Sequence, residues 1–269
     1  MKGTQSMFDS LSGYIALITG GSSGIGFEMA KQLLSQGATV IISARAGKRL
    51  DDAATTLHAQ GYDVHALPMD VTIEASVSDA AKWVEEKFDH LDMVVNDAGI
   101  GRNAPGMEGL PADCHFYDIP VPTVKAVIDT NLIGYFIVAS KFVPIMLKQG
   151  HGSLVYVSTS TNTMIKPGQL PYGPSKAGAE AMSTIMANEL REMGIMVNVI
   201  CPGGFTDTAM AGEGMKEFFL QNHMPILPPT ILNRTISFLA SPLSTGISGE
   251  KIIGKDFDTW LKNRGITFR

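Results

Sequence analysis

Cysteine, clustered histidine and long apolar runs are all scarce in this sequence, and each absence narrows the choice of function. Cys114 and Cys201 are the only cysteines among 269 residues. Two are too few for a disulfide framework, so a reducing compartment, the cytoplasm, is expected. The six histidines are dispersed without ligand spacing, so no metal site is expected. Residues 1–12 lack the apolar core of a signal peptide, and the longest apolar runs are too short to span a bilayer.

An excess of positive charge is also lacking. The chain has 21 Lys and Arg against 26 Asp and Glu, a net charge of −5, and its basic residues are scattered. Nucleic acid is therefore not an expected partner, and neither is a membrane. Apolar residues make up 45% of the chain and it has 28 glycines, which suits a large buried parallel sheet with many turns. Because no linker-like stretch interrupts it, a single domain over residues 1–269 is expected.

Short apolar runs alternate with helical stretches along most of the chain. The expected strands are 14–19, 38–43, 64–69, 93–96, 152–158 and 196–200, and the expected helices are 27–36, 48–60, 73–88, 121–149 and 172–193. This alternation predicts right-handed crossovers between parallel strands. The fold class is then α/β: a single-domain, Rossmann-like, doubly wound parallel sheet with helices on both faces. In such a sheet, ligands bind beyond the carboxyl ends of the strands.

A glycine-rich turn separates the first expected strand from the first helix. Glycines permit a tight turn and let the backbone approach a pyrophosphate, while the N–H groups at the helix start attract its negative charge. The spacing departs from the usual Gly-x-Gly-x-x-Gly, because three residues separate the first two glycines. The sequence nevertheless predicts a dinucleotide site here. Its expected residues are Gly20, Ser22, Ser23, Gly24, Ile25 and Gly26.

The end of the second expected strand favours one dinucleotide over the other. No Asp or Glu occurs between residues 39 and 50, whereas Arg45, Lys48 and Arg49 cluster there. An acid at this place accepts the ribose 2′-OH of NAD, and an arginine suits the 2′-phosphate of NADP. The cofactor is therefore expected to be NADP(H), with Arg45 as the main phosphate partner. Lys48 and Arg49 are equally compatible with the start of a solvated helix.

Tyr172 and Lys176 are spaced for one face of a helix, one turn apart. An ammonium beside a phenol favours the phenolate and lowers the phenol pKa, which is otherwise about 10. Taken alone, such a pair is more often a solvated surface pair. The glycine-rich turn upstream makes general acid–base catalysis the favoured interpretation.

Together these motifs resemble those of the classical short-chain dehydrogenase/reductase family, over about Ser12–Gly254. The run from Thr19 to Gly26 is similar to that family's cofactor motif. The run Asn-Asp-Ala-Gly at 96–99 is similar to its Asn-Asn-Ala-Gly, with Asp97 in place of the second asparagine. The resemblance implies further cofactor contacts from Asp70, Val71, Asn96, Ala98, Gly99, Tyr172, Lys176, Pro202 and Gly203. Phe205 and Thr206 are expected at the nicotinamide carboxamide, with Thr208 as the alternative.

The resemblance also implies the reaction: NADP(H)-dependent hydride transfer that interconverts a ketone or aldehyde with an alcohol. Tyr172 would donate or accept the proton. Lys176 would lower the phenol pKa and hold the nicotinamide ribose, and Asn131 would hold a water in a proton relay. A non-catalytic NADPH-binding sensor on the same fold is the alternative, and it is suggested by Asp97. A lyase or epimerase is disfavoured, because the whole catalytic set is retained.

The sequence offers three candidates for the catalytic hydroxyl. The family's serine commonly lies thirteen residues before the tyrosine, and that position is Thr159 here, flanked by Ser158 and Ser160. Any of the three supplies an O–H donor to a substrate oxygen. The choice therefore stays open, with Thr159 and Ser158 as the leading candidates.

Three segments set this chain apart. Residues 100–130 form a longer Gly- and Pro-rich connection, expected at the substrate end of the sheet. Residues 206–230 are expected to form a lid, loosened by Gly212 and Gly214, whose methionines suit a hydrophobic or mixed substrate. Their apolar side chains would equally suit a helix face packed on the core. The apolar tail, 254–269, would pack on a neighbouring subunit, cover the substrate or fold back on its own core. The resemblance implies a homo-oligomer, a dimer or tetramer, with helix 172–193 at the interface.

Overall fold

One parallel sheet organises the molecule, as expected from the alternating pattern. The computed structural model describes residues 10–108, 110–111, 114–211 and 215–268. The sheet has seven strands in the order β3-β2-β1-β4-β5-β6-β7. They are β1 (Ile15–Thr19), β2 (Thr39–Ala44), β3 (Val64–Pro68), β4 (Met93–Asn96), β5 (Gly152–Val157), β6 (Ile195–Cys201) and β7 (Lys251–Ile253). The predicted fold class, a single Rossmann-like α/β domain, is confirmed, and β7 is a strand that the pattern did not indicate.

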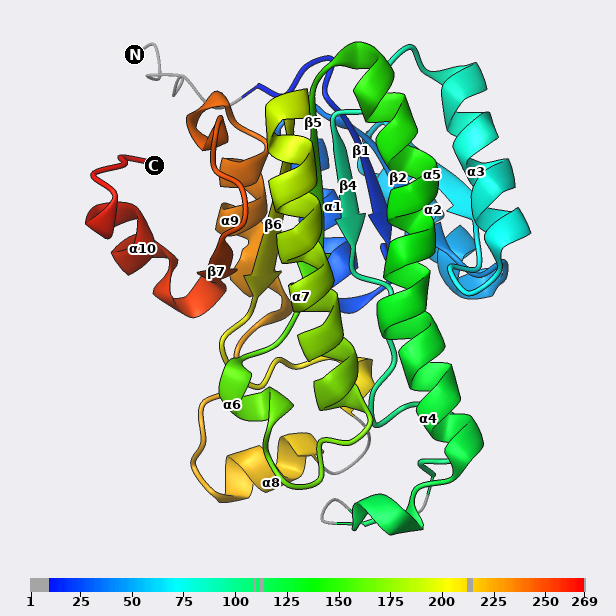
Figure 1. Ribbon diagram of the computed structural model, residues 1–269, viewed down its shortest axis with the longest axis vertical. Coiled ribbons are helices and arrows are strands. Elements are labelled where there is room, and N and C mark those ends of the chain that lie inside the picture. The colour runs from blue at the N-terminus through cyan, green and yellow to red at the C-terminus, as the bar shows by residue number, and fades with distance from the viewer. Residues whose placement is uncertain (1–9, 109, 112–113, 212–214, 269) are drawn as a thin grey trace.

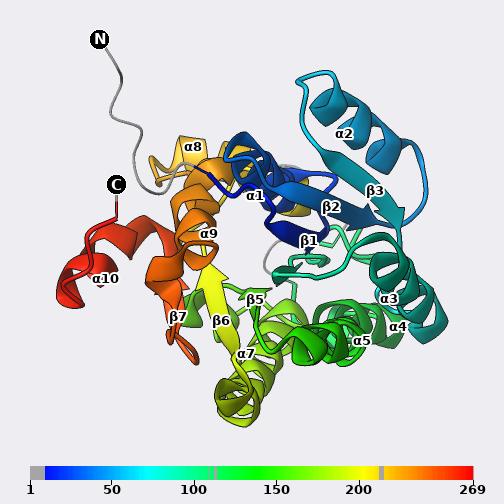
Figure 2. The ribbon, with the colours of Figure 1, turned by 90° about the horizontal axis from the view of Figure 1, so that it is seen from above.

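Helices cover both faces of the sheet (Figure 2). They are α1 (Gly24–Ser35), α2 (Lys48–His58), α3 (Glu74–Lys87), α4 (Val121–Ile128), α5 (Gly134–Gln149), α6 (Thr161–Met164), α7 (Tyr172–Leu190), α8 (Met215–Gln221), α9 (Asn233–Leu239) and α10 (Phe257–Asn263). Side chains of β1 alternate between two cores: Ala16 and Ile18 pack with α1, α2 and α9, and Leu17 packs with α3, α5 and α7. This two-sided burial explains why the strands read as continuous apolar runs.

The order of strands fixes where a ligand can bind. The chain winds outward from β1 to β3, then returns to place β4 on the other side of β1. The carboxyl ends of β1 and β4 therefore border the crevice at which the winding direction reverses. In Figure 1 the strand arrowheads point toward the end of the molecule where α6 and α8 lie.

The long helix expected over residues 121–149 is interrupted by a wider turn. The chain runs from α4 through a π-helical turn, Asp129–Ile133, into α5. Such turns insert one extra residue into the helix and are frequent at functional sites. Asn131 lies within this turn and is fully buried.

The same helical stretch, Val121–Gln149, is long and apolar enough by length and composition to cross a membrane, with a mean hydropathy of 1.5. The stretch contains no uninterrupted apolar run long enough to cross a membrane, and the high hydropathy is an average over a window that also includes polar residues. Its apolar side chains serve the core, because Val138, Phe142 and Met146 are fully buried against the sheet. Core packing therefore accounts for its composition.

The C-terminal tail folds back onto its own domain. Phe238 of α9 contacts the rings of Phe257, Trp260 and Phe268, with centroid distances of 5.6, 5.6 and 5.4 Å. Edge-to-face aromatic pairs at such distances add about 0.5–1.5 kcal/mol beyond the burial of apolar area. Of the three arrangements left open by the sequence, the structure has this one.

The long connection after β4 has a small core of its own. Arg102 donates hydrogen bonds to the carbonyl oxygens of Leu110 and Pro111, at 2.8 and 2.9 Å. The buried side chains beneath it are Ala104, Met107, Cys114, Ile119 and Val127. The described part of the connection has loop character, as expected, with one 3₁₀ turn at Phe116–Asp118, and it packs on this small core.

Candidate active site

The glycine-rich turn is pressed against the segment that follows β4. Gly20 has φ +73°, and an ideal Cβ on it would lie 2.9 Å from the backbone nitrogen of Ala98. An ideal Cβ on Gly26 would lie 2.5 Å from Asp97 Oδ2. Glycine is thus the residue that fits at both positions. Gly24, with φ +57°, faces only the side chain of Thr208, so a cradle remains open around it.

Hydrogen bonds of Thr19 tie the ends of β1 and β4 together. Its hydroxyl donates to the carbonyl of Val95 at 3.3 Å and accepts from the N–H groups of Asp97 and Ala98, each at 3.1 Å. Asn96 beside them is fully buried, and neither amide atom has a hydrogen-bond partner in the described part of the chain. Buried polar groups are nearly always paired. That Asn96 contacts a cofactor stays a prediction, and its unpaired amide is compatible with it.

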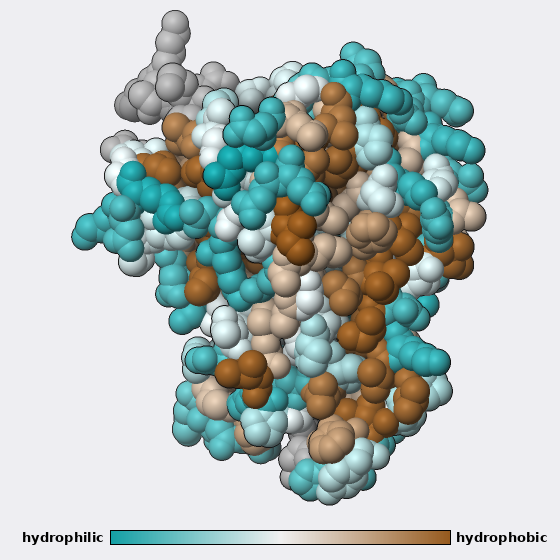
Figure 3. Space-filling view, viewed as in Figure 1, coloured by the Kyte–Doolittle hydropathy of each residue, from teal (hydrophilic) through white to brown (hydrophobic). Residues whose placement is uncertain are grey.

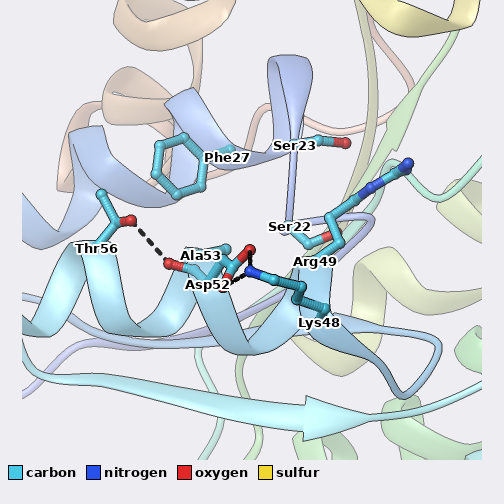
Figure 4. A pocket seen from close by; sticks show the side chains of 8 residues that line it. All are labelled: Ser22, Ser23, Phe27, Lys48, Arg49, Asp52, Ala53 and Thr56. Atoms are coloured by element: carbon cyan, nitrogen blue, oxygen red, sulfur yellow. Dashed lines mark hydrogen bonds and ion pairs between the residues drawn. The ribbon is translucent and has the colours of Figure 1, made fainter.

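A cavity of about 500 Å³ opens between the start of α1 and α2 (Figure 4). Ser22, Ser23 and Arg49 line one side of it, while Lys48 is turned toward Asp52, with its Nζ 2.6 and 2.7 Å from the two carboxylate oxygens. Lys48 thus forms an exposed ion pair within α2. Arg45 is exposed just past the end of β2. Neither Arg45 nor Arg49 has an ion-pair or hydrogen-bond partner for its guanidinium among the described residues, so both are free to meet an anion.

Asp70 and Val71 follow β3, as expected. Asp70 Oδ1 accepts hydrogen bonds from the backbone N–H and the hydroxyl of Thr72, at 2.9 and 2.7 Å. Val71 is buried against Gly134, where an ideal Cβ would lie 2.9 Å from Val71 Cγ2. Asp70 is thus held at the strand end, and Val71 packs on the start of α5.

Tyr172 and Lys176 occupy the first turns of α7, and the expected pairing on one face is present. Lys176 Nζ lies 5.8 Å from the centre of the Tyr172 ring. It donates hydrogen bonds to the hydroxyl of Tyr135 at 2.8 Å and to the carbonyl of Val157 at 2.9 Å. An ideal Cβ on Gly101 would lie 3.5 Å from Tyr172 Cδ2, so the loop after β4 reaches the phenol ring.

The expected effect of Lys176 on the phenol pKa is wrong for this structure. Burial raises the pKa of Tyr172 above its ordinary value, and electrostatic interactions with Asp97 and Cys201 act in the same direction. Desolvation disfavours the charged form. Lys176 does not reverse this, because its ammonium is directed at Tyr135 and Val157. The phenol of Tyr172 is therefore protonated at neutral pH in this state.

Asp97 and Lys176 interact electrostatically, and their pKa values shift toward each other. Burial raises the pKa of Asp97, opposed by the charge of Lys176 and by a hydrogen bond from the Gly26 N–H. Burial lowers the pKa of Lys176, opposed by the charges of Asp97 and Glu180. The replacement of asparagine by Asp97 thus places a carboxyl group close to Lys176.

The structure distinguishes the three candidate hydroxyls. Ser158 donates its hydrogen bond to Glu180 Oε1 at 2.5 Å. Ser160 caps α6, where its Oγ accepts from the N–H of Thr163 at 3.3 Å and lies 2.8 Å from the Thr163 hydroxyl. Thr159 is only partly buried, and its hydroxyl has no hydrogen-bond partner among the described residues. Thr159 is therefore the hydroxyl that remains available to a ligand.

The side chain of Asn131 is held by three hydrogen bonds, and it is not exposed to solvent. Its Oδ1 accepts from the Ile100 N–H at 2.9 Å, and its Nδ2 donates to the Ile100 carbonyl at 2.9 Å and to Ser175 Oγ at 3.0 Å. The π-helical turn thereby joins the loop after β4 to α7. Whether Asn131 holds a water in a relay stays a prediction.

The Pro202–Gly203 turn follows β6 and lies against the C-terminal segment. Gly203 has φ +91°, and an ideal Cβ would lie 2.5 Å from Ile253 Cγ2. The backbone N–H of Lys255 donates to the Pro202 carbonyl at 3.1 Å. The turn is thus a fixed edge of the crevice.

The segment expected as a lid begins directly after this turn. Thr206 pairs with Leu227 in an isolated bridge, and the ring of Phe205 stacks on Phe219 at 4.1 Å. Helix α8 has no buried side chain, so the alternative that it packs an apolar face into the core is wrong. The side chain of Met210 contacts the Gly99–Gly101 loop, 3.4 Å from an ideal Cβ on Gly101. Gly212 and Gly214 lie outside the described residues, and the opening of a lid stays a prediction.

A comparison with protein-family models decides the family. The model of short chain dehydrogenases matches residues 14–217. The chain belongs to the short-chain dehydrogenase family. The resemblance seen in the sequence is confirmed, and the protein is an oxidoreductase of that family, whose members use NAD(P).

Known short-chain dehydrogenases match nearly the whole chain. A 3-oxoacyl-[acyl-carrier-protein] reductase of Thermotoga maritima is 33% identical over 252 residues, 91% of this chain and 97% of the relative. The oxidoreductase YxjF of Bacillus subtilis is 30% identical over 256 residues, 89% of this chain and 95% of the relative. A gluconate 5-dehydrogenase from Burkholderia cenocepacia, solved with NADP and tartrate, has a TM-score of 0.80 at 23% identity, with 93% and 97% of the two chains covered. That last likeness shows the fold.

Sequence reasoning missed Tyr135, which contacts the lysine of this short-chain dehydrogenase directly. It lies four residues after Asn131, so the same helical spacing that paired Tyr172 with Lys176 could have placed it on the inner face. Glu180, which accepts the hydrogen bond of Ser158, lies four residues after Lys176 and was missed for the same reason.

The raised pKa of Asp97 predicts a pH-dependent difference in stability. The folded chain keeps a proton on Asp97 that the unfolded chain releases above about pH 4. Asp97 therefore destabilises the fold increasingly as pH rises above that value. Asp97→Asn removes this pH-dependent loss of stability. It also lowers the pKa of Lys176, which makes the variant more stable relative to the wild type as pH rises. The melting temperature of the wild type should fall by about 5 °C relative to Asp97→Asn between about pH 5 and 8. A difference that stays constant over this range contradicts the burial of a protonated carboxyl.

Proposed function

We propose that this chain is an NADP(H)-dependent oxidoreductase that interconverts a ketone or aldehyde with an alcohol, with Tyr172 as proton donor and acceptor. One observation carries the proposal. It concerns the positions of three polar groups. Tyr172 and Lys176 are at the start of α7, and Thr159, whose hydroxyl is unpaired among the described residues, follows the carboxyl end of β5. The glycine-rich turn adjoins them across β4 and β1.

The residues present fit a dinucleotide. The buried amide of Asn96 lacks a protein partner among the described residues, and Gly24 leaves open space beside the backbone at the start of α1. Gly20, Ser22, Ser23, Gly24, Ile25 and Gly26 would hold the pyrophosphate, and Asp70, Val71, Asn96, Ala98 and Gly99 would line the adenosine side. Pro202, Gly203, Phe205 and Thr206 would border the nicotinamide. When bound, the nucleotide supplies or accepts a hydride.

The preference for a 2′-phosphate is supported by charge. Arg45 and Arg49 have no partner among the described residues, and no carboxylate occurs at the end of β2 to accept a 2′-OH. An arginine fork bonds a phosphate through two N–H groups with matched geometry. Lys48 would contribute less, because its ammonium is paired with Asp52 at the surface.

The chain's own residues would act on the substrate oxygen and its proton. In reduction, Tyr172 gives its phenol proton to the developing alkoxide, and in oxidation the phenolate takes it back. Burial raises the pKa of Tyr172, so the phenol carries its proton at neutral pH but releases it less readily than an exposed phenol would. Thr159 would donate a hydrogen bond to the same oxygen and stabilise the charge that develops there. Lys176 would hold the nicotinamide ribose, and Asn131 would keep the loop after β4 in register with α7.

The relatives support the class of substrate. The Thermotoga maritima relative is named as a reductase of 3-oxoacyl groups, which are ketones. The apolar side chains of Met210 and Phe219 near the crevice favour a substrate with a hydrophobic part. Location in the cytoplasm, proposed from the cysteine content, stays a prediction.

A homo-oligomer is proposed from the outer face of the helices. Phe136 and Leu147 on α5 and Ile185 on α7 are 51%, 41% and 58% exposed. Figure 3 shows apolar side chains gathered over this side of the molecule. Exposed apolar surface of this kind marks association. Light scattering at micromolar concentration should give the mass of a dimer or tetramer, and the mass of one chain would contradict the proposal.

The proton-transfer role predicts the effect of Tyr172→Phe. This variant keeps the ring and loses the proton, so turnover of carbonyl compounds should fall by at least about 1,000-fold, toward the upper range of general acid–base contributions. Its affinity for NADPH should stay within about threefold of wild type, because the phenol is only one of many proposed contacts. Absorbance at 340 nm measures turnover, and NADPH fluorescence measures binding.

Tyr117→Phe is the matched control, since Tyr117 is 69% exposed on the loop before α4. It should leave both quantities unchanged. Turnover that survives in Tyr172→Phe would show that another group moves the proton.

The phosphate contact predicts the effect of Arg45→Ala. Loss of a hydrogen bond to a charged group costs about 1.5–3 kcal/mol, so the affinity for NADPH should fall by about 10- to 150-fold. The affinity for NADH, which has no 2′-phosphate, should change little. Lys48→Ala should affect NADPH less, because Lys48 is paired with Asp52. An unchanged ratio of the two affinities in Arg45→Ala would refute the contact.

A further inference from the structure

A second tyrosine lies against the lysine of the proposed site. Tyr135, on the first turn of α5, is fully buried. Its hydroxyl accepts a hydrogen bond from Lys176 Nζ at 2.8 Å, and Lys176 also donates to the Val157 carbonyl at 2.9 Å. The Tyr135 hydroxyl donates in turn to the Val157 carbonyl at 3.3 Å. The ammonium is thus held between α5, β5 and α7.

Core packing accounts for an aromatic ring at position 135, but it does not account for the hydroxyl group on that ring. The ring lies 5.5 Å from that of Tyr156 on β5, within the core on the α5 side of the sheet. Phenylalanine would fill that space equally well. A buried hydroxyl needs a partner, and this one finds Lys176. Burial raises the pKa of Tyr135 well above its ordinary value, so the phenol stays neutral and keeps a lone pair for the ammonium.

The contact is one of two successive links between the chain before β5 and helix α7. Asn131 of the π-helical turn donates to Ser175 Oγ at 3.0 Å, and one turn later Tyr135 accepts from Lys176. The two links bind neighbouring residues of α7. The two hydrogen bonds therefore fix the position of α7 along the axis of α5 and the direction of the Lys176 side chain.

Water, which normally solvates an ammonium, is excluded at this place. Lys176 is 2% exposed, and an ammonium has three N–H donors to satisfy. Two of them go to Tyr135 and Val157. One donor then remains, and it is free for a ligand.

We propose that Tyr135 is a positioning residue: its hydroxyl anchors the Lys176 ammonium and leaves one N–H donor directed at the ligand. The inference rests on the function proposed above for Lys176. Tyr135 itself touches neither substrate nor nucleotide in this account. It acts through the lysine, in place of a solvating water.

The pKa of Lys176 depends on the charged and titratable groups around it. Asp97 follows β4, Glu180 lies one turn further along α7, Tyr172 lies one turn before, and Tyr135 faces it from α5. Tyr156 on β5 packs on Tyr135. A hydrogen bond accepted from the ammonium favours its charged form. Removing only the Tyr135 hydroxyl should therefore lower the pKa of Lys176 while leaving its carboxylate neighbours in place.

The test compares Tyr135→Phe with Tyr156→Phe. Tyr156 is an equally buried tyrosine on the neighbouring strand, but its hydroxyl contacts Met186 Sδ at 3.0 Å and not the lysine. NADPH affinity is measured by fluorescence from about pH 6 to 10 without substrate, and the pH profile of kcat/KM is measured with a carbonyl substrate. Tyr135→Phe should move the alkaline limb of both profiles down by about one pH unit. Tyr156→Phe should leave both limbs in place.

Two further variants make each outcome decisive. Lys176→Met should abolish the alkaline limb of NADPH binding, and a limb that persists would overturn both the role of Lys176 and this inference. 3-Fluorotyrosine at position 135 keeps the shape and weakens the acceptor, so it should shift the limb in the same direction even if Tyr135→Phe folds poorly. Equal shifts in Tyr135→Phe and Tyr156→Phe, or none in either Tyr135 variant, would mean that Tyr135 only packs. Because NADPH binding is read without turnover, failure of Tyr172 as the proton donor would leave this test intact.

Discussion

A lysine ammonium inside a dry core is the constraint on which this structure depends. Lys176 is buried at the meeting point of β5, α5 and α7, where it must be given acceptors that water would otherwise provide. The Val157 carbonyl and the Tyr135 hydroxyl supply two of them, and Asp97, whose pKa is raised by burial, lies nearby. These contacts hold the start of α7, which carries Tyr172, against α5 and β5.

The same constraint links the catalytic end of the crevice to the nucleotide end. Asp97 contacts the glycine-rich turn through the Gly26 N–H, and its backbone is tied to β1 by the Thr19 hydroxyl. The carboxyl group therefore lies between the glycine-rich turn and the lysine. Asparagine, which the family commonly has there, carries no charge, so the Asp97–Lys176 pair gives this chain a dependence on pH that an uncharged amide would lack.

The sequence was sufficient wherever a feature is local. Strand and helix periodicity, the glycine spacing before Gly26 and the four-residue interval between Tyr172 and Lys176 are all short-range patterns, and they predicted the sheet and the position of the crevice. The phenol pKa depends on burial, which comes from distant segments, so its direction was wrongly predicted. The identity of the free hydroxyl depended on Glu180 and on the cap of α6, which leave only Thr159 unpaired. The packing of Phe257 on Phe238 likewise joins segments whose contact no local pattern specifies.

A crystal structure of the complex with NADP tests the central claim most directly. The account predicts that Lys176 keeps its hydrogen bonds to Tyr135 and Val157 while its third donor meets the nicotinamide ribose. The hydroxyls of Tyr172 and Thr159 should then face the same side of the nicotinamide ring. A complex in which Lys176 leaves its two acceptors, or in which Tyr172 lies remote from the ring, would contradict it.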